Sequence, residues 1–82
     1  MKVTIITPDT LAFEGENITS VTVPGTLGSF QVLKNHAAIV STLEDGKVII
    51  ETGKEKKEFF IKGGVVEVKD NIISILAEGF QQ

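Results

Sequence analysis

Hydrophobic positions alternate with polar ones along most of this 82-residue chain. Val3 and Ile5, for example, are flanked by Lys2 and Thr4. Because successive side chains of an extended chain point to opposite faces, each such segment offers one apolar face to a core. β-branched residues dominate these segments, which favours strands. The inward positions predicted in this way are Val3, Ile5, Val21, Val23, Val48, Ile50, Phe59, Ile61, Val66, Val68, Ile73 and Ile75.

Turn residues separate the predicted strands. Asp45-Gly46 and Thr52-Gly53-Lys54 predict tight reversals with positive φ, and Asp70-Asn71 predicts a left-handed turn. Pro8 and Pro24 lack a backbone N–H, so we expect them at strand ends or edges. This punctuation, without a long helical stripe, indicates an all-β fold, either an antiparallel sandwich or a barrel.

One segment, residues 34–44, fits two structures. His36, Val40 and Leu43 share a face at helical spacing, whereas the β-branched run around Val40 favours an extended chain, which we expect. The charges from Lys54 to Glu58 are mixed in sign, and we interpret them as a solvated hairpin tip.

Composition limits the possible functions. The length allows one small domain, and the absence of cysteine excludes disulfides, thiolate catalysis and cysteine metal sites. All 8 basic residues are lysines, against 11 acidic residues and a net charge of −3, which argues against nucleic-acid binding. No apolar run reaches the roughly 18–20 residues of a membrane span, and the N-terminus resembles neither a signal nor a transit peptide. We expect a reducing compartment, and membrane contact only through a partner.

Residues with catalytic potential are few. His36, the single histidine, could act as a general base or metal ligand, or could bond backbone or lie at a contact surface, which we favour because neither cysteine nor a second histidine is present. No serine lies in a nucleophile-elbow pattern. Glu14 and Glu16 project to the same side of an extended segment and could form an acid–base pair, but their glycine and asparagine neighbours favour exposure. We therefore expect no catalytic residue, no metal and no cofactor.

Two glycine-containing stretches match no phosphate-binding fingerprint. Gly63-Gly64 and Gly25–Gly28 indicate instead turns, bulges or the close approach of another chain. We favour close approach for Gly25–Gly28, because Leu27 and Phe30 add large apolar side chains to that loop. Packing beneath the loop remains an alternative for these two side chains.

Several blocks, in order and spacing, resemble a known family from Val3 to about Ala77. They are Thr7-Pro8-Asp9, Phe13-Glu14-Gly15, Val23-Pro24-Gly25-Thr26-Leu27-Gly28-Ser29-Phe30-Gln31-Val32-Leu33, His36-Ala37, Leu43 and Gly63-Gly64-Val65-Val66-Glu67-Val68. The combination of Val-Pro-Gly, a downstream His-Ala and a Gly-Gly-x-x-Glu-Val strand resembles the epsilon subunit of rotary F-type ATP synthases.

The resemblance implies a single domain over residues 1–82, a two-sheet antiparallel β-sandwich of about ten short strands. It also implies a non-catalytic place in the central stalk, linking the gamma subunit to the membrane c-ring and supporting the coupling of ion translocation to ATP synthesis. The expected location is peripheral, on the cytoplasmic side of a bacterial inner membrane. Carried over by position, the c-ring contact falls on Gly28, Ser29, Phe30 and Gln31, and the gamma contact on Thr7, Pro8, His36 and Ala37.

This sequence departs from the family pattern at three places. Ser29 stands where many relatives carry a glutamate, so a hydrogen bond is retained but an ion pair with the ring is not implied. Lys34-Asn35 replaces Pro-Gly before the histidine, and Asn35 can adopt the same left-handed turn. The sequence stops at Gln82, where most bacterial relatives continue into an inhibitory pair of helices, so we expect these residues neither to bind nucleotide nor to inhibit through such a hairpin.

Two other functions stay open at this point. A lipoyl- or biotinyl-carrier domain is a similarly small acidic β-domain with a modified lysine on a hairpin, for which Lys47 is the nearest candidate. A small hydrolase would use His36 as its base.

Overall fold

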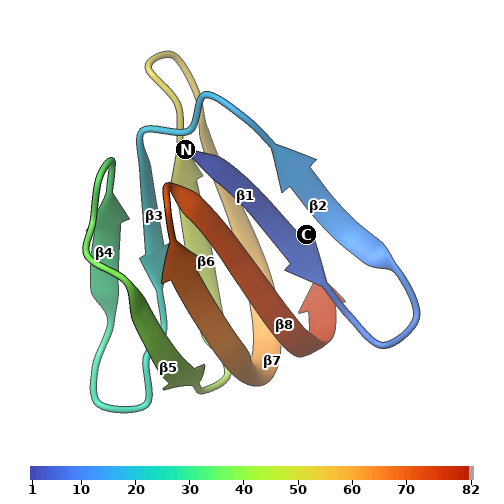
Figure 1. The fold of residues 1–82 in the computed structure, drawn as a ribbon. Helices are drawn as coiled ribbons and strands as arrows, with labels where there is room; N and C mark the ends of the chain where they lie inside the picture. The colour runs from blue at the N-terminus through green and yellow to red at the C-terminus, as the bar shows by residue number, and fades with distance from the viewer. Residues whose placement is uncertain (82) are drawn as a thin grey trace.

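The computed structural model describes residues 1–81 and contains strands but no helix there (Figure 1). Gln82, the last residue of the predicted domain, lies outside the described residues. The strands are β1 (Lys2–Ile6), β2 (Leu11–Gly15), β3 (Ser20–Val23), β4 (Phe30–Leu33), β5 (Ile39–Leu43), β6 (Gly46–Glu51), β7 (Lys56–Lys69) and β8 (Ile72–Gln81). The all-β prediction is confirmed, but the described residues form eight strands instead of ten, because β7 and β8 are long.

Strand β7 belongs to two sheets. Its first part pairs with β6, from Lys56 to Ile61, and its second part pairs with β5, from Gly64 to Val68. The change of direction falls at Gly63 and Gly64, whose φ angles are 48° and 133°. Such angles are accessible to glycine at little cost. Strand β8 follows β7 through the bend and pairs with it on both sides.

The two sheets face each other as the layers of a sandwich (Figure 1). The front sheet has the order β2-β1-β8-β7-β5, and the back sheet the order β8-β7-β6-β3-β4. One pairing corrects the antiparallel prediction, because β1 runs parallel to β8. Parallel neighbours need a long connection, and the first and last strands of a chain have all the intervening elements to provide it.

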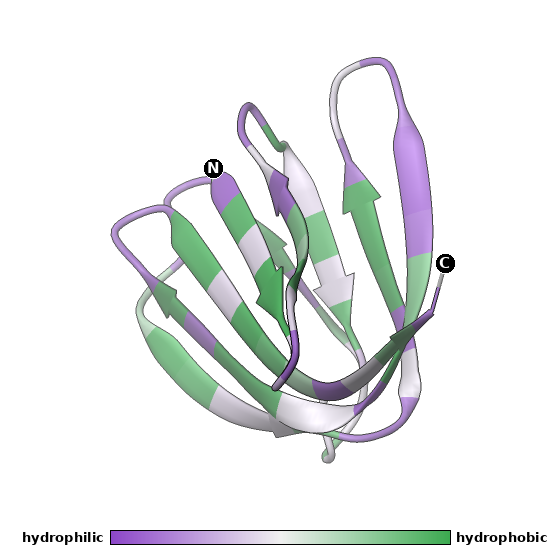
Figure 2. Cartoon of the chain, turned by 90° about the vertical axis from the view of Figure 1, so that its right-hand side faces the viewer, coloured by the Kyte–Doolittle hydropathy of each residue, from purple (hydrophilic) through white to green (hydrophobic). Residues whose placement is uncertain are grey.

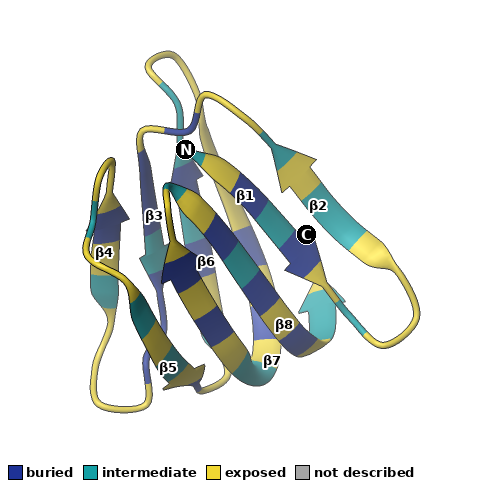
Figure 3. Ribbon diagram, in the orientation of Figure 1, coloured by how far each residue is buried: buried dark blue, intermediate teal, exposed yellow. Residues whose placement is uncertain are grey.

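The core lies between the sheets and confirms the predicted alternation. All the predicted inward positions, from Val3 to Ile75, are buried, and buried and exposed bands alternate along the strands (Figure 3). The hydropathy of the strands alternates in the same way (Figure 2). Phe59 adds an aromatic cluster, since its ring centroid is 5.1 Å from those of both Phe13 and Phe80. Each fully buried large apolar side chain contributes roughly 1.5–3 kcal/mol to stability.

The turn predictions are confirmed in part. Asp70 and Asn71 have φ angles of 53° and 61°, as the left-handed turn requires. The positive φ predicted for Asp45-Gly46 is wrong, because β5 and β6 lie in different sheets and the chain crosses between layers there. Position 46 favours glycine for a steric reason instead, because a Cβ there would lie 2.8 Å from Pro24 Cβ. Gly53 also lacks a positive φ, although β6 and β7 form the expected hairpin.

The remaining local predictions concern residues 34–44, the prolines and the charged cluster. Strand β5 confirms the extended interpretation of the first segment, and both prolines lie outside strands. The hairpin tip is shorter than predicted, because Lys56 already begins β7. Within residues 1–81, no helix is long and apolar enough to cross a membrane.

Candidate partner-docking surfaces

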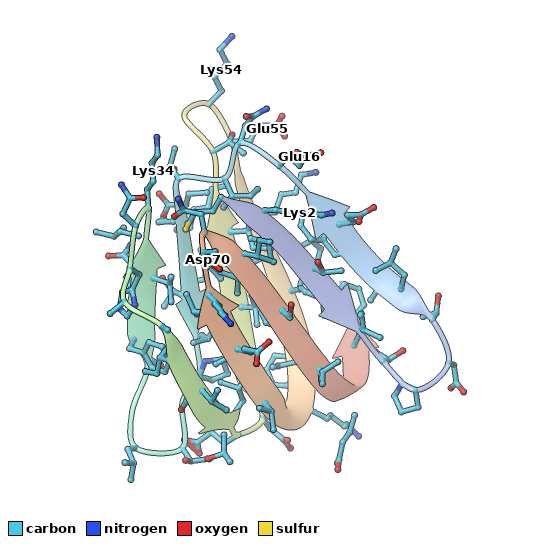
Figure 4. All side chains as sticks on the ribbon, viewed as in Figure 1. Lys2, Glu16, Lys34, Lys54, Glu55 and Asp70 are labelled. Atoms are coloured by element: carbon cyan, nitrogen blue, oxygen red, sulfur yellow. The ribbon has the colours of Figure 1, made fainter. Side chains whose placement is uncertain are left out.

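The strand directions sort the connections into two ends of the sandwich (Figure 1). The charged end holds the connections at residues 16–19, 34–38, 52–55 and 70–71. The bend end holds those at residues 7–10, 24–29 and 44–45, together with the bend of β7. Figure 4 labels charged side chains of the first group, namely Glu16, Lys34, Lys54, Glu55 and Asp70, all at the charged end.

The β3–β4 loop at the bend end has a fixed backbone. The Gly28 N–H donates to the Gly25 carbonyl at 2.9 Å, which closes a tight turn. The Thr26 N–H donates to the Thr42 carbonyl at 3.1 Å, and the two threonine hydroxyls are 2.7 Å apart. Gly25 admits no side chain, since a Cβ there would lie 2.7 Å from the Gly28 carbonyl oxygen. The loop is therefore held against β5 on one side and closed on itself on the other.

The structure brings the four predicted ring-side residues together at the bend end. Gly28, Ser29 and Gln31 are exposed, whereas Phe30 is half-buried. The Phe30 ring covers Gly25, with Cε1 2.9 Å from the Cβ position of that glycine, and packs against the core. The loop thus turns its aromatic side chain inward and its polar groups outward.

The four predicted gamma-side residues do not lie together. Thr7 and Pro8 follow β1 at the bend end, and His36 and Ala37 precede β5 at the charged end. Both pairs adjoin the front sheet, one next to β1 and the other next to β5. They therefore flank the outer face of this sheet from opposite ends.

The loop that carries His36 is held by the β7–β8 turn. The Asn35 N–H donates to Asn71 Oδ1 at 2.6 Å, and Asn71 Nδ2 donates to Asn35 Oδ1 at 2.9 Å. Asn35 has a φ of 64°, which confirms the predicted left-handed conformation. His36 Nδ1 is 2.8 Å from the Ala37 carbonyl oxygen. This bond to backbone fits the interpretation of His36 as a structural or contact residue better than that of a general base.

The outer face of the front sheet carries a row of exposed apolar side chains that the sequence did not predict. The register places Leu11 beside Ile6, Ile6 beside Leu76, and Leu76 beside Val65. These four residues, here called the apolar row, are 53%, 39%, 54% and 37% exposed. At the usual spacing of neighbouring strands the row spans about 14 Å.

The same face holds most of the exposed large apolar residues of the described chain. Six of the nine lie on it, namely Ile6, Leu11, Val40, Val65, Ile72 and Leu76. A sequence signal did exist, since pairs such as Ile5-Ile6 and Ile75-Leu76 are apolar on both faces of a strand. Only the strand pairing, however, aligns the second members of these pairs into one surface.

The other candidate groups do not form a reaction centre. Glu14 and Glu16 are exposed, as expected, and line an open cleft of about 150 Å³ beside β2. Lys47 lies within β6 opposite Phe60 and is 3.4 Å from Glu58, so it is not at the hairpin tip that a carrier domain requires. Among residues 1–81, no group of three or more histidine, aspartate or glutamate side chains could hold a metal.

Comparison with known proteins agrees with this geometry. The family model described as ATP synthase, Delta/Epsilon chain, beta-sandwich domain matches residues 1–82. An ATP synthase epsilon chain of Chlorobium limicola is 42% identical over 78 residues, which cover 94% of this chain and 88% of that relative. One from Leptospira interrogans is 44% identical over 78 residues, but this chain spans only 61% of its length.

Chains in two solved ATP synthase structures share this fold. A chain in the Euglena gracilis mitochondrial ATP synthase, OSCP/F1/c-ring, superposes with a TM-score of 0.87 at 25% identity, covering 95% of this chain and 50% of that one. A chain of the Tetrahymena thermophila mitochondrial ATP synthase central stalk/c-ring superposes with a TM-score of 0.78 at 25% identity, covering 98% and 64%. By sequence over its whole length and by fold, this chain belongs to the ATP synthase epsilon family and comprises its β-sandwich domain.

Proposed function

We propose that this chain is a non-catalytic central-stalk subunit of an F-type ATP synthase, which links the gamma subunit to the c-ring. In this role it supports the coupling of ion translocation to ATP synthesis without reacting itself. It would lie peripherally on the cytoplasmic side of a bacterial inner membrane, held there by its partners. The observation that carries the proposal is the apolar row, because a contiguous exposed apolar surface favours a protein partner.

The gamma subunit is the partner that we assign to the outer face of the front sheet. Thr7-Pro8 and His36-Ala37, the residues that the family resemblance relates to gamma, flank this face from opposite ends. The apolar row lies between them. A contact that covered the row and reached both loops would explain why residues so far apart in the fold share one partner.

The c-ring is the partner that we assign to the bend end. Gly28, Ser29 and Gln31 form an exposed polar surface on a loop held in place by the bonds of Thr26 to β5. A surface of this kind suits contact with polar loops. Because β7 and β8 continue from one sheet into the other, force applied at either surface passes through shared strands and a close-packed core.

Two exposed leucines provide a matched test of the gamma assignment. Leu76 lies in the apolar row and is 54% exposed, while Leu33 lies on β4 of the back sheet and is 51% exposed. We expect Leu76→Ser to weaken binding to the gamma subunit of the same organism about tenfold, because the contact would bury only the exposed half of this leucine side chain. Isothermal titration calorimetry with the purified chain measures the effect.

Leu33→Ser is the control and should leave the affinity for gamma unchanged. Equal affinities of the wild type and Leu76→Ser would remove the front sheet from the gamma contact. No binding of the wild type to gamma would overturn the proposed function as a whole.

A further inference from the structure

Leu27 differs from every other exposed apolar residue of the described chain. Its exposure is 103%, so no neighbouring residue covers its side chain. Phe30, three residues later, is half-buried against Gly25 and the core. The two large apolar side chains of this glycine-containing stretch thus have opposite roles, one inside the loop and the other outside it.

The exposure of Leu27 does not come from a loosely held backbone. Leu27 lies between Thr26, which bonds to Thr42 through both backbone and hydroxyl, and Gly28, which closes the turn onto Gly25. Leucine is not a residue that central turn positions favour, since Gly, Asn, Asp, Ser and Pro predominate there. Leu27 therefore serves neither the core nor the turn, and burial of its side chain against a partner would be favourable.

We infer that Leu27 is the apolar anchor of the bend end, inserting into an apolar recess between the polar loops of the ring-side partner. This inference rests on the proposed function, because it deepens the c-ring contact. Its support is continuity, since Leu27 directly precedes the exposed Gly28 and Ser29 of the same held loop. An apolar anchor surrounded by polar groups is the usual arrangement of an energetically dominant contact.

The anchor also accounts for the serine at position 29. A serine cannot form the ion pair that a glutamate would offer a basic ring loop, so attraction has to come from another group. Burial of Leu27 provides such an attraction and needs no charge on the partner. The contribution of Leu27 would consequently depend little on salt concentration, because screening acts on charges, such as those of the exposed Asp9, Glu44 and Asp45 at the same end.

Two variants of Leu27 test this inference, and a variant of Leu33 serves as the control. The chain is bound to the gamma subunit, and the binding of detergent-solubilised c-ring from the same organism to this complex is measured by biolayer interferometry. We expect Leu27→Ser to weaken ring binding about ten- to hundredfold, as the loss of one fully buried leucine predicts. Leu27→Met should restore most of the affinity, and Leu33→Ser should have no effect. Leu27→Ser removes no core contact, so the thermal unfolding curve should match the wild type.

The results separate this inference from the proposed function. If Leu27→Ser binds the ring as tightly as the wild type, the anchor is refuted while the central-stalk role stands. If the wild-type complex with gamma does not bind the ring, the anchor is refuted together with the c-ring contact, and the gamma contact stands. If the chain does not bind gamma, the proposed function fails first.

Discussion

Among the glycines of the described chain, Gly64 leaves the least room for a side chain. A Cβ at this position would overlap the carbonyl oxygen of Leu76 and lie 2.9 Å from Ala77 Cα, and the φ of Gly64 is 133°. Gly28 has a similar φ of 126°, but nothing lies within 4 Å of its Cβ position. Gly53 has neither a positive φ nor a close neighbour. A comparison of substitutions at these three glycines therefore distinguishes the cost of a strained φ from the cost of steric overlap.

Alanine substitutions at these positions should therefore form a graded series. We expect Gly53→Ala to change the free energy of unfolding by less than about 0.5 kcal/mol, and Gly28→Ala to lower it by about 1–2 kcal/mol through strain alone. Gly64→Ala combines strain with displacement of β8 and should cost more than about 3 kcal/mol. Urea denaturation measures all three. Equal losses for Gly28→Ala and Gly64→Ala would contradict the assigned role of the Leu76 contact.

Residue identity predicted some of these local features and not others. Asp70 and Asn71 lie between two apolar runs, and their left-handed geometry could be predicted because both side chains tolerate it. Asp45-Gly46 has the same kind of sequence signal, yet the chain there crosses between sheets. The difference depends on which strands pair afterwards, and a dipeptide carries no information on that. The opposite orientations of Leu27 and Phe30 could not be predicted for the same reason.

At the scale of elements, β7 shows how strongly the two faces of a strand differ. Phe59 and Phe60 are adjacent, but Phe59 is 7% exposed and packs against two other rings, whereas Phe60 is 44% exposed. We expect Phe59→Ala to lower the free energy of unfolding by about 3–5 kcal/mol, and Phe60→Ala to lower it by less than about 1 kcal/mol. Chemical denaturation compares the two variants. Similar losses would mean that the alternation of faces does not determine stability in this strand.

Period-two alternation identified the inward face of every strand for which it was used, because it depends only on backbone geometry. It did not give the length of β7, since Gly63-Gly64 is compatible with a turn, a bulge or a bend. It also gave neither the parallel pair β1–β8 nor the apolar row. These features depend on contacts between distant parts of the chain, and pairing decides whether an outward apolar residue is isolated or part of a surface.

Of the predicted site residues, the contiguous Gly28–Gln31 stretch lies together, while the gamma-side residues are separated by the whole length of the sheet.

At the scale of the whole molecule, the shared strands determine how the domain unfolds. Strands β7 and β8 pair with each other on both sides of the bend, so neither sheet keeps its full pairing if the other opens. If the two sheets shared no strand, one sheet could open while the hydrogen bonds of the other stayed intact. Here the opening of one sheet also disrupts β7 and β8, which belong to the other sheet as well. The domain should therefore unfold in a single cooperative transition.

Native-state hydrogen exchange tests this cooperativity. The amides of Ile75 in the front sheet and Val48 in the back sheet, both buried, should exchange with the same free energy of opening and the same denaturant dependence. Amides of β4, an edge strand of four residues, should exchange faster through local opening and serve as the internal comparison. If Val48 exchanged through a smaller opening than Ile75, the two sheets would be separable units. The proposed gamma and ring surfaces would then not be joined by one cooperative unit, although β7 and β8 run through both sheets.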